Sequence, residues 1–105
     1  MKSEYKELRK QKEIEETCRR FHVDRLELFG SALESEKKAN DYDFVVRLGK
    51  ESRGRLLKDY IGLAESLESL LGKPVELVTE RSLKNPYFRE KVMRQKRVVY
   101  ERTHY

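Results

Sequence analysis

The chain has 105 residues, enough for one domain with a modest hydrophobic core. Charged residues make up 41% of it, hydrophobic residues 37%, and the formal net charge is +5. The hydrophobic residues recur in periodic clusters, which excludes a disordered chain. A single cysteine, Cys18, excludes an internal disulfide, and no apolar run reaches the length of a membrane span. We expect one domain over residues 1–105.

The N-terminal segment, residues 1–21, is predicted to be helical from about residue 3. Ile14, Cys18 and Phe21 recur at the i, i+4, i+7 spacing of one helix face, although the first half of the segment is sparsely apolar. The opening MKSEYKELRK has no apolar core of the kind that signal peptides carry. We therefore expect a cytoplasmic protein.

Two strands are predicted next. Residues 24–29 alternate between apolar and polar types, as a half-buried strand does, and Gly30-Ser31 ends this strand. Ser31 and Glu34 have the spacing of a capping box, which indicates a short helix. After a charged loop, residues 41–46 predict the second strand.

The strongest helical signal covers residues 55–71, after a loop at 48–54. Gly72, with a proline two residues later, is expected to end this helix. The apolar residues of the predicted helix form a broad stripe: Leu56, Leu57, Tyr60, Ile61, Leu63, Ala64, Leu67, Leu70 and Leu71.

The last part of the chain predicts a short strand at 75–78 and a helix that begins at Asn85-Pro86 and reaches about residue 95. Residues 97–100 are a possible edge strand. Residues 81–105 hold eight Lys or Arg and two Glu, so this basic C-terminal part suggests an anionic partner; a solvated helix face explains the charges equally well. The order of elements predicts an α/β (α+β) fold, with a single small mixed β-sheet and helices packed on it.

Two carboxylates open the second predicted strand. Because strand side chains alternate between faces, Asp41 and Asp43 point the same way, roughly 6–7 Å apart. Mg²⁺ prefers such oxygen ligands and fills its other positions with water and phosphate oxygens. Glu76, in the strand at 75–78, is expected to face outward as they do. A solvated polar face on an exposed strand is the alternative explanation.

Gly30 and Ser31 suit a phosphate group. A glycine lets the backbone approach a ligand closely, and free amides at a helix start attract anions. Lys37 and Lys38, in the loop that follows, lie within reach of phosphate oxygens or are simply exposed.

Taken together, this ordered set resembles the minimal nucleotidyltransferases (MNT) of the DNA polymerase beta superfamily. Residues 81–89 also resemble the end of the MNT antitoxins that are paired with HEPN ribonuclease toxins. The resemblance covers most of the chain from about residue 21. Its matching stretches are LFGS (28–31), NDYDFVV (40–46), GKPVELVT (72–79) and RSLKNPYFR (81–89).

The resemblance implies a polymerase-beta-like fold and a role for each site residue. Asp41 and Asp43 would hold two Mg²⁺ ions, and Glu76 would bind one of them and help deprotonate the attacking hydroxyl. Gly30 and Ser31 would grip the terminal phosphates of the nucleotide. The resemblance further implies ATP as donor and a tyrosine of a HEPN toxin as acceptor, so that AMP transfer silences the toxin.

The sequence also departs from the family pattern. Ala32 and Leu33 follow the Gly-Ser pair where members often carry Arg, the loop is one residue shorter than the commonest spacing, and Glu76 replaces the usual Asp. Because of these departures, the alternative interpretation is an antitoxin that neutralises its partner by binding alone. A nucleic-acid-binding module that uses the basic C-terminal part is a third, less favoured interpretation, because it leaves the three carboxylates unexplained.

Overall fold

The computed structural model describes residues 4–102 and contains one mixed four-stranded sheet in the order β3-β2-β1-β4. The strands are β1 (Val23–Phe29), β2 (Tyr42–Leu48), β3 (Val75–Thr79) and β4 (Arg97–Glu101). β1 is antiparallel to both β2 and β4, whereas β2 and β3 are parallel. The predicted α/β fold class with a single mixed sheet is thereby confirmed.

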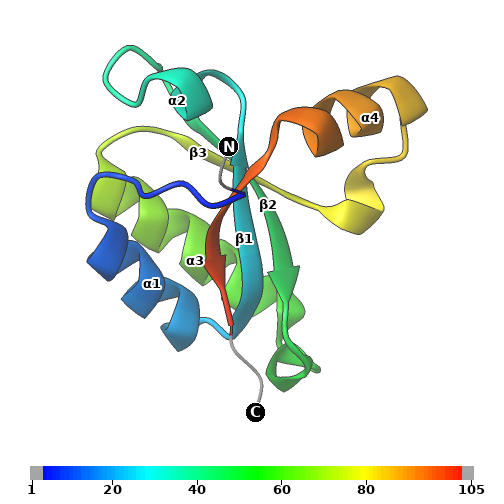
Figure 1. The fold of residues 1–105 in the computed structure, drawn as a ribbon. Helices are drawn as coiled ribbons and strands as arrows, with labels where there is room; N and C mark the ends of the chain where they lie inside the picture. The colour runs from blue at the N-terminus through cyan, green and yellow to red at the C-terminus, as the bar shows by residue number, and fades with distance from the viewer. Residues whose placement is uncertain (1–3, 103–105) are drawn as a thin grey trace.

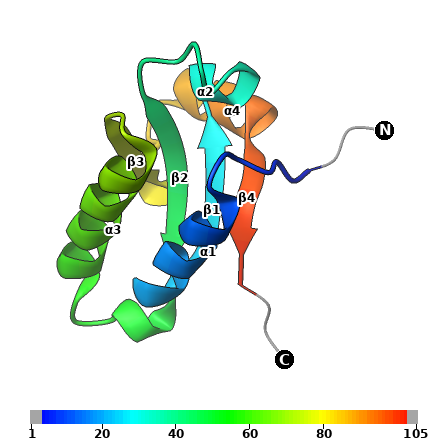
Figure 2. The same cartoon turned by 90° about the vertical axis from the view of Figure 1, so that its left-hand side faces the viewer.

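The helices divide between the two faces of this sheet (Figures 1 and 2). α1 (Gln11–Arg20) and α3 (Leu56–Leu71) cover one face, and α4 (Pro86–Gln95) lies on the other. The short α2 (Ser31–Glu34) stands at the end of the sheet where β1 finishes and β2 begins. Two 3-10 turns, Lys50–Ser52 and Glu80–Ser82, complete the connections.

The main core lies between the sheet and the α1–α3 layer. Alternate residues of β1 and β2 enter it, because neighbouring strand side chains point to opposite faces. Its fully buried members include Leu26, Leu28, Tyr42, Phe44, Val46, Ile14, Cys18, Leu63 and Leu67. A smaller cluster under α4 joins Val45, Leu83 and Val92 to the half-buried Phe29 and Val78. The face with the smaller cluster therefore retains room for polar side chains.

The N-terminal helix is shorter than predicted. α1 begins at Gln11 because Lys10 adopts a left-handed conformation, with φ 64°. Before it, the chain runs beside β4: the Lys6 amide donates to the Val98 carbonyl at 2.8 Å, and the Val98 amide donates to the Glu4 carbonyl at 2.7 Å. The helical prediction for residues 4–10 was wrong because a sparsely apolar segment gains more from pairing with a strand edge. Residues 1–3 of that prediction lie outside the described residues.

α3 matches its prediction closely in length, and Gly72 ends it in the left-handed conformation. The predicted apolar stripe was too broad, however. Leu56, Leu57 and Ile61 are exposed, because only one side of the helix packs against the sheet. None of the helices in residues 4–102 has the length and apolar character needed to cross a membrane.

The C-terminal elements agree with the sequence. Asn85 caps α4 with its side chain, which accepts from the amides of Tyr87 and Phe88, and Pro86 is the first helical residue. The possible edge strand is real and pairs with β1 as β4.

β3 is the other edge of the sheet, and side chains hold it in place. The Val75 amide donates to Glu68 Oε2 at 2.9 Å, and the Tyr60 hydroxyl donates to the Leu77 carbonyl. Glu68 and Tyr60 both come from α3. The strand that carries Glu76 is therefore fastened on its outer side to the helical layer.

We expect Leu67→Ala to lower the free energy of unfolding by about 3 kcal/mol, because Leu67 is fully buried and truncation leaves a cavity in the core. Urea denaturation followed by circular dichroism measures this change. Leu57→Ala is the matched control on the same helix. Leu57 is 70% exposed, so its truncation should change stability by no more than about 0.5 kcal/mol. Equal losses in the two variants would contradict this packing.

Candidate functional site

Three of the predicted site residues, Gly30, Asp43 and Glu76, meet at one end of the sheet. Asp43, the second residue of β2, lies opposite Phe29 of β1 and level with Glu76 of β3. Its neighbour Val45 packs in the small cluster under α4, so Asp43 and Glu76 lie on that face, away from the main core. Asp41 precedes β2 in a bend and is half-buried.

Gly30 brings the end of β1 against the same carboxylate. Its φ is +80°, and a Cβ built on it would lie only 2.4 Å from Asp43 Oδ2. Any side chain at this position would occupy the space next to the carboxylate, so the site requires glycine for both its backbone conformation and its size.

Ser31 begins α2, directly after Gly30, and is exposed. The capping box predicted from Ser31 and Glu34 is wrong. The N-cap residue is Gly30, no side chain caps the helix, and the Leu33 amide bonds to the Gly30 carbonyl at 3.1 Å. Because the start of α2 lies one residue earlier than a capping box requires, the Ser31 hydroxyl remains available at the surface.

The electrostatics of the site centre on Asp43. Its pKa is raised from 3.8 to about 6, first by desolvation, then by the negative charge of Asp41, and then by a hydrogen bond to Glu76 and by the charge of that residue. The fold therefore holds Asp43 in a place where its ionised form is less favourable than in water. A cation at this position would relieve the repulsion.

The residues present fit a divalent cation in part. Among residues 4–102, no three His, Cys, Asp or Glu side chains form a complete metal-binding group as they stand. Mg²⁺, however, is commonly held by one or two carboxylates, with water and substrate phosphates at its other positions. Asp43 and Glu76 meet that smaller requirement, and Asp41 adds a third negative charge. The absence of a side chain at Gly30 leaves space next to Asp43.

A cavity of about 580 Å³ adjoins Gly30 on the side of β4. Its charged lining is mainly basic, with Lys6, Arg94 and Arg97 against Glu34. A positively charged flank beside the predicted phosphate-binding backbone suits an anionic ligand.

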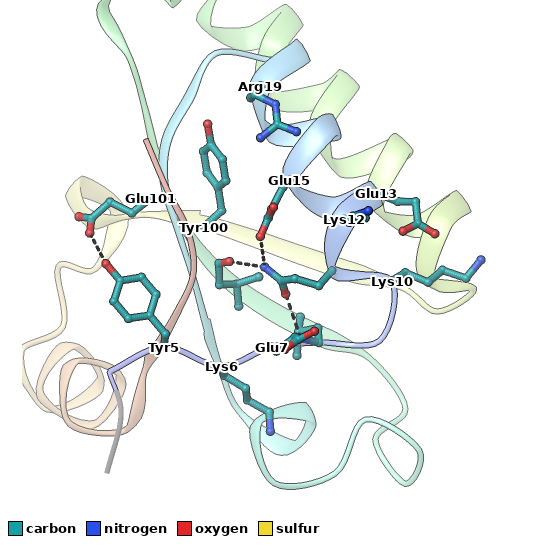
Figure 3. Close-up of a pocket in the computed structure, with 13 residues that line it drawn as sticks. Tyr5, Lys6, Glu7, Lys10, Lys12, Glu13, Glu15, Arg19, Tyr100 and Glu101 are labelled. Atoms are coloured by element: carbon teal, nitrogen blue, oxygen red, sulfur yellow. Dashed lines mark hydrogen bonds between the residues drawn. The ribbon is translucent and has the colours of Figure 1, made fainter. Parts of the chain in front are cut away.

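A larger cavity, of about 850 Å³, lies elsewhere, between the N-terminal segment, α1 and β4 (Figure 3). Lysines and glutamates line it in a mixture, and Gln11 spans it by donating to Glu15 Oε2 and to the Val99 carbonyl. None of the predicted site residues lines this cavity, so its size alone does not make it the functional site.

Lys73 was not among the residues predicted for the site. Its ammonium donates to three backbone carbonyls in the loop between α2 and β2. No local pattern reveals such contacts, because the bonded residues lie 34 to 37 positions away in the sequence. The only sequence signal was the position of Lys73 between Gly72 and Pro74, in the tight connection that leads to Glu76.

Comparison with known proteins gives a consistent result. The profile of the family described as "Polymerase beta, Nucleotidyltransferase" matches residues 12–105. Two proteins of Methanocaldococcus jannaschii, both named "putative protein adenylyltransferase", are similar to this chain. One is 36% identical over 92 residues, covering 86% of this chain and 89% of the relative. The other is 33% identical over 72 residues, covering 68% and 73%.

Solved structures agree with the sequence relatives. The structure of a "putative minimal nucleotidyltransferase" has a TM-score of 0.65 and 34% identity, over 82% of this chain and 85% of that one. A crystal structure of a toxin-antitoxin with AMP-PNP has a TM-score of 0.61 and 24% identity, over 90% of this chain and 76% of that one. The second match shows a shared fold.

We expect Asp43→Asn to stabilise the metal-free protein at neutral pH. Because the pKa of Asp43 is higher in the folded state than its ordinary value of 3.8, the folded state binds the proton more tightly. The free energy of unfolding of the wild type therefore falls as pH rises from about 4 to about 6, and stays at the lower level above that range. Asparagine carries no charge and avoids this loss.

At pH 7.5 the expected gain is about 1 kcal/mol, which allows for solvent screening of a partly exposed carboxyl. It corresponds to about 4 °C in Tm. Thermal denaturation in EDTA at pH 7.5 and at pH 4 measures it, and the difference between the proteins should shrink at pH 4. A variant that is less stable at pH 7.5 would contradict the raised pKa.

Proposed function

Since the chain belongs to the polymerase beta nucleotidyltransferase family, we propose that it is an Mg²⁺-dependent adenylyltransferase that transfers AMP from ATP to a hydroxyl of a partner protein. The observation that carries this proposal is the register of β2 and β3, which sets Asp43 beside Glu76. The pairing of β1 with β2 brings Gly30 next to the same aspartate. The M. jannaschii relatives carry the name of the same activity, which supports AMP as the transferred group.

Each site residue has a role in this proposal. Asp41, Asp43 and Glu76 would hold the cations, two in number, which would supply positive charge to the phosphates and to the attacking oxygen. The exposed Ser31 hydroxyl and the backbone at Gly30 hold the terminal phosphates. Glu76, the most exposed of the three carboxylates, also receives the proton of the acceptor hydroxyl. The acceptor oxygen then bonds to the α-phosphorus, and pyrophosphate leaves with the electrons of the broken bond.

The partner we propose is a HEPN toxin, with a tyrosine as acceptor and the chain acting as its antitoxin. Residues 81–89 resemble the MNT antitoxins of such pairs. A toxin-antitoxin with this fold has been crystallised with AMP-PNP, which supports the combination of a nucleotide and a protein partner. A basic cavity next to Gly30 offers space beside the nucleotide.

Neutralisation by binding alone is the second candidate. It is favoured by Ala32 and Leu33, which follow Ser31 and provide no cation for the triphosphate. Ala32 is fully buried, so even its position is unavailable to a ligand.

Nucleic-acid binding is less favoured, because two basic residues of the C-terminal part are already paired within the chain. Lys96 binds the buried Glu27, and Arg102 binds Glu51 at 2.7 Å.

We expect the double variant Asp41→Asn with Asp43→Asn to lose AMP transfer by at least about 100-fold, because it removes two of the charges that hold the cations. The measurement is intact-mass spectrometry of a co-purified HEPN toxin incubated with ATP and Mg²⁺. EDTA should abolish the reaction of the wild type as well. Glu65→Gln, on the exposed side of α3, is the control and should leave transfer unchanged.

A survival assay separates the two candidates. If the double variant protects cells from the toxin as well as the wild type does, while mass spectrometry detects no modified toxin with either protein, binding alone is the function and the transferase proposal is rejected.

A further inference from the structure

Lys73 lies in the connection between α3 and β3, and its ammonium is surrounded by backbone oxygens. It donates to the carbonyl of Ala39 at 2.6 Å, to that of Lys37 at 3.3 Å, and to that of Glu36. An ammonium has three donors, and all three are used here. Lys73 therefore adds three hydrogen bonds to the loop between α2 and β2, beside the bond from the Ala39 amide to the Ser35 carbonyl at 3.1 Å.

The same loop is held from a second direction through Glu36. Tyr42 donates its hydroxyl to Glu36 Oε1 at 2.9 Å, and the Arg9 amide donates to Glu36 Oε2 at 2.9 Å. The ring of Tyr42 is fully buried, and its centroid lies 6.0 Å from the Lys73 ammonium. The backbone is joined as well, since the Tyr42 amide donates to the Pro74 carbonyl at 3.0 Å. We call Lys73, Glu36 and Tyr42 the loop clamp.

The position of the loop clamp relates it to the carboxylates. Ala39 stands two residues before Asp41, Tyr42 lies between Asp41 and Asp43, and Lys73 stands three residues before Glu76. The clamp thus joins the segment that delivers the two aspartates to the segment that delivers the glutamate. Sheet pairing fixes Asp43 against Glu76, but Asp41 lies in a bend outside the strand and has no such support.

We propose that Lys73 is a positioning residue for this site. Through the loop clamp it fixes the backbone before β2, and thereby sets the position of Asp41 relative to Asp43 and Glu76. Its role is to hold the loop backbone through the three carbonyls rather than to bind a ligand. The consequence for catalysis rests on the proposed adenylyl transfer, whereas the consequence for the loop does not.

Lys73→Met tests this role, because it keeps the length of the side chain and removes its three hydrogen bonds. Hydrogen–deuterium exchange of the amides of residues 36–41 should become at least about tenfold faster. In AMP transfer to the partner, kcat should fall about 100-fold, the loss that a misplacement of about 1 Å produces. KM for ATP should change by no more than about threefold, because Gly30 and Ser31 belong to a different segment.

Lys58→Met is the matched control. Lys58 is an exposed lysine on α3, and its side chain forms no hydrogen bond or ion pair within residues 4–102. It should leave exchange and kcat unchanged. Tyr42→Phe is a milder second variant that removes only the bond to Glu36, and it should speed exchange of the loop amides by about threefold. It keeps the test decisive if Lys73→Met does not fold.

The outcomes are separable. Unchanged exchange of residues 36–41 in Lys73→Met, or in Tyr42→Phe if the first variant does not fold, overturns the proposal. A rise in KM for ATP with kcat unchanged also overturns it, since that result would make Lys73 a nucleotide-binding residue. If the wild type transfers no AMP, the proposed function fails, and the exchange measurement alone then decides whether the loop clamp exists.

Discussion

The parallel pairing of β2 with β3 is the constraint on which the site depends. It sets Asp43 beside Glu76, and the neighbouring positions Phe44 and Leu77 enter the main core together. A slip of one residue would turn Glu76 to the other face and expose Leu77. The hydrophobic effect that buries Leu77 therefore also fixes the distance between two acidic groups, and no separate interaction is needed to bring them together.

The unequal use of the two sheet faces follows from this arrangement. α1 and α3 bury one face almost completely, while α4 covers the other only in part. The partly covered face can hold carboxylates without burying them fully, which keeps them accessible to a ligand. The protein still accepts an unfavourable interaction there, since Asp43 is held close to Asp41 and Glu76. Perturbed pKa values of this kind cluster at functional sites.

Much of this arrangement could be predicted from the sequence, because it follows from local patterns. Alternation located the strands, Gly72 located the end of α3, and the Gly30-Ser31 pair located a turn next to the acidic residues. The roles of Asp41, Asp43, Glu76, Gly30 and Ser31 remain predictions, although the structure brings Gly30, Asp43 and Glu76 together.

What the sequence did not reveal depends on contacts between distant segments. The apolar content of residues 4–10 is low for any secondary structure, so the choice between helix and extended chain depended on the edge of β4 being available. Lys73 looks like any exposed lysine in its local sequence, and its role becomes visible only when the loop at 36–39 folds over it. The positive charge of residues 81–105 suggested an anionic partner, but one of these residues, Lys96, forms an ion pair with the buried Glu27 inside the chain.

The attachment of Glu4 and Lys6 to Val98, together with the bonds from Glu68 and Tyr60 to β3, has a consequence for recognition. Both outer margins of the sheet are already satisfied at these positions, by main chain on one side and by side chains on the other. Addition of a strand from a binding protein, or from a second copy of the chain, is therefore disfavoured at these positions. A binding partner would instead contact the side chains of the helices and loops. Its specificity would then depend on single surface residues.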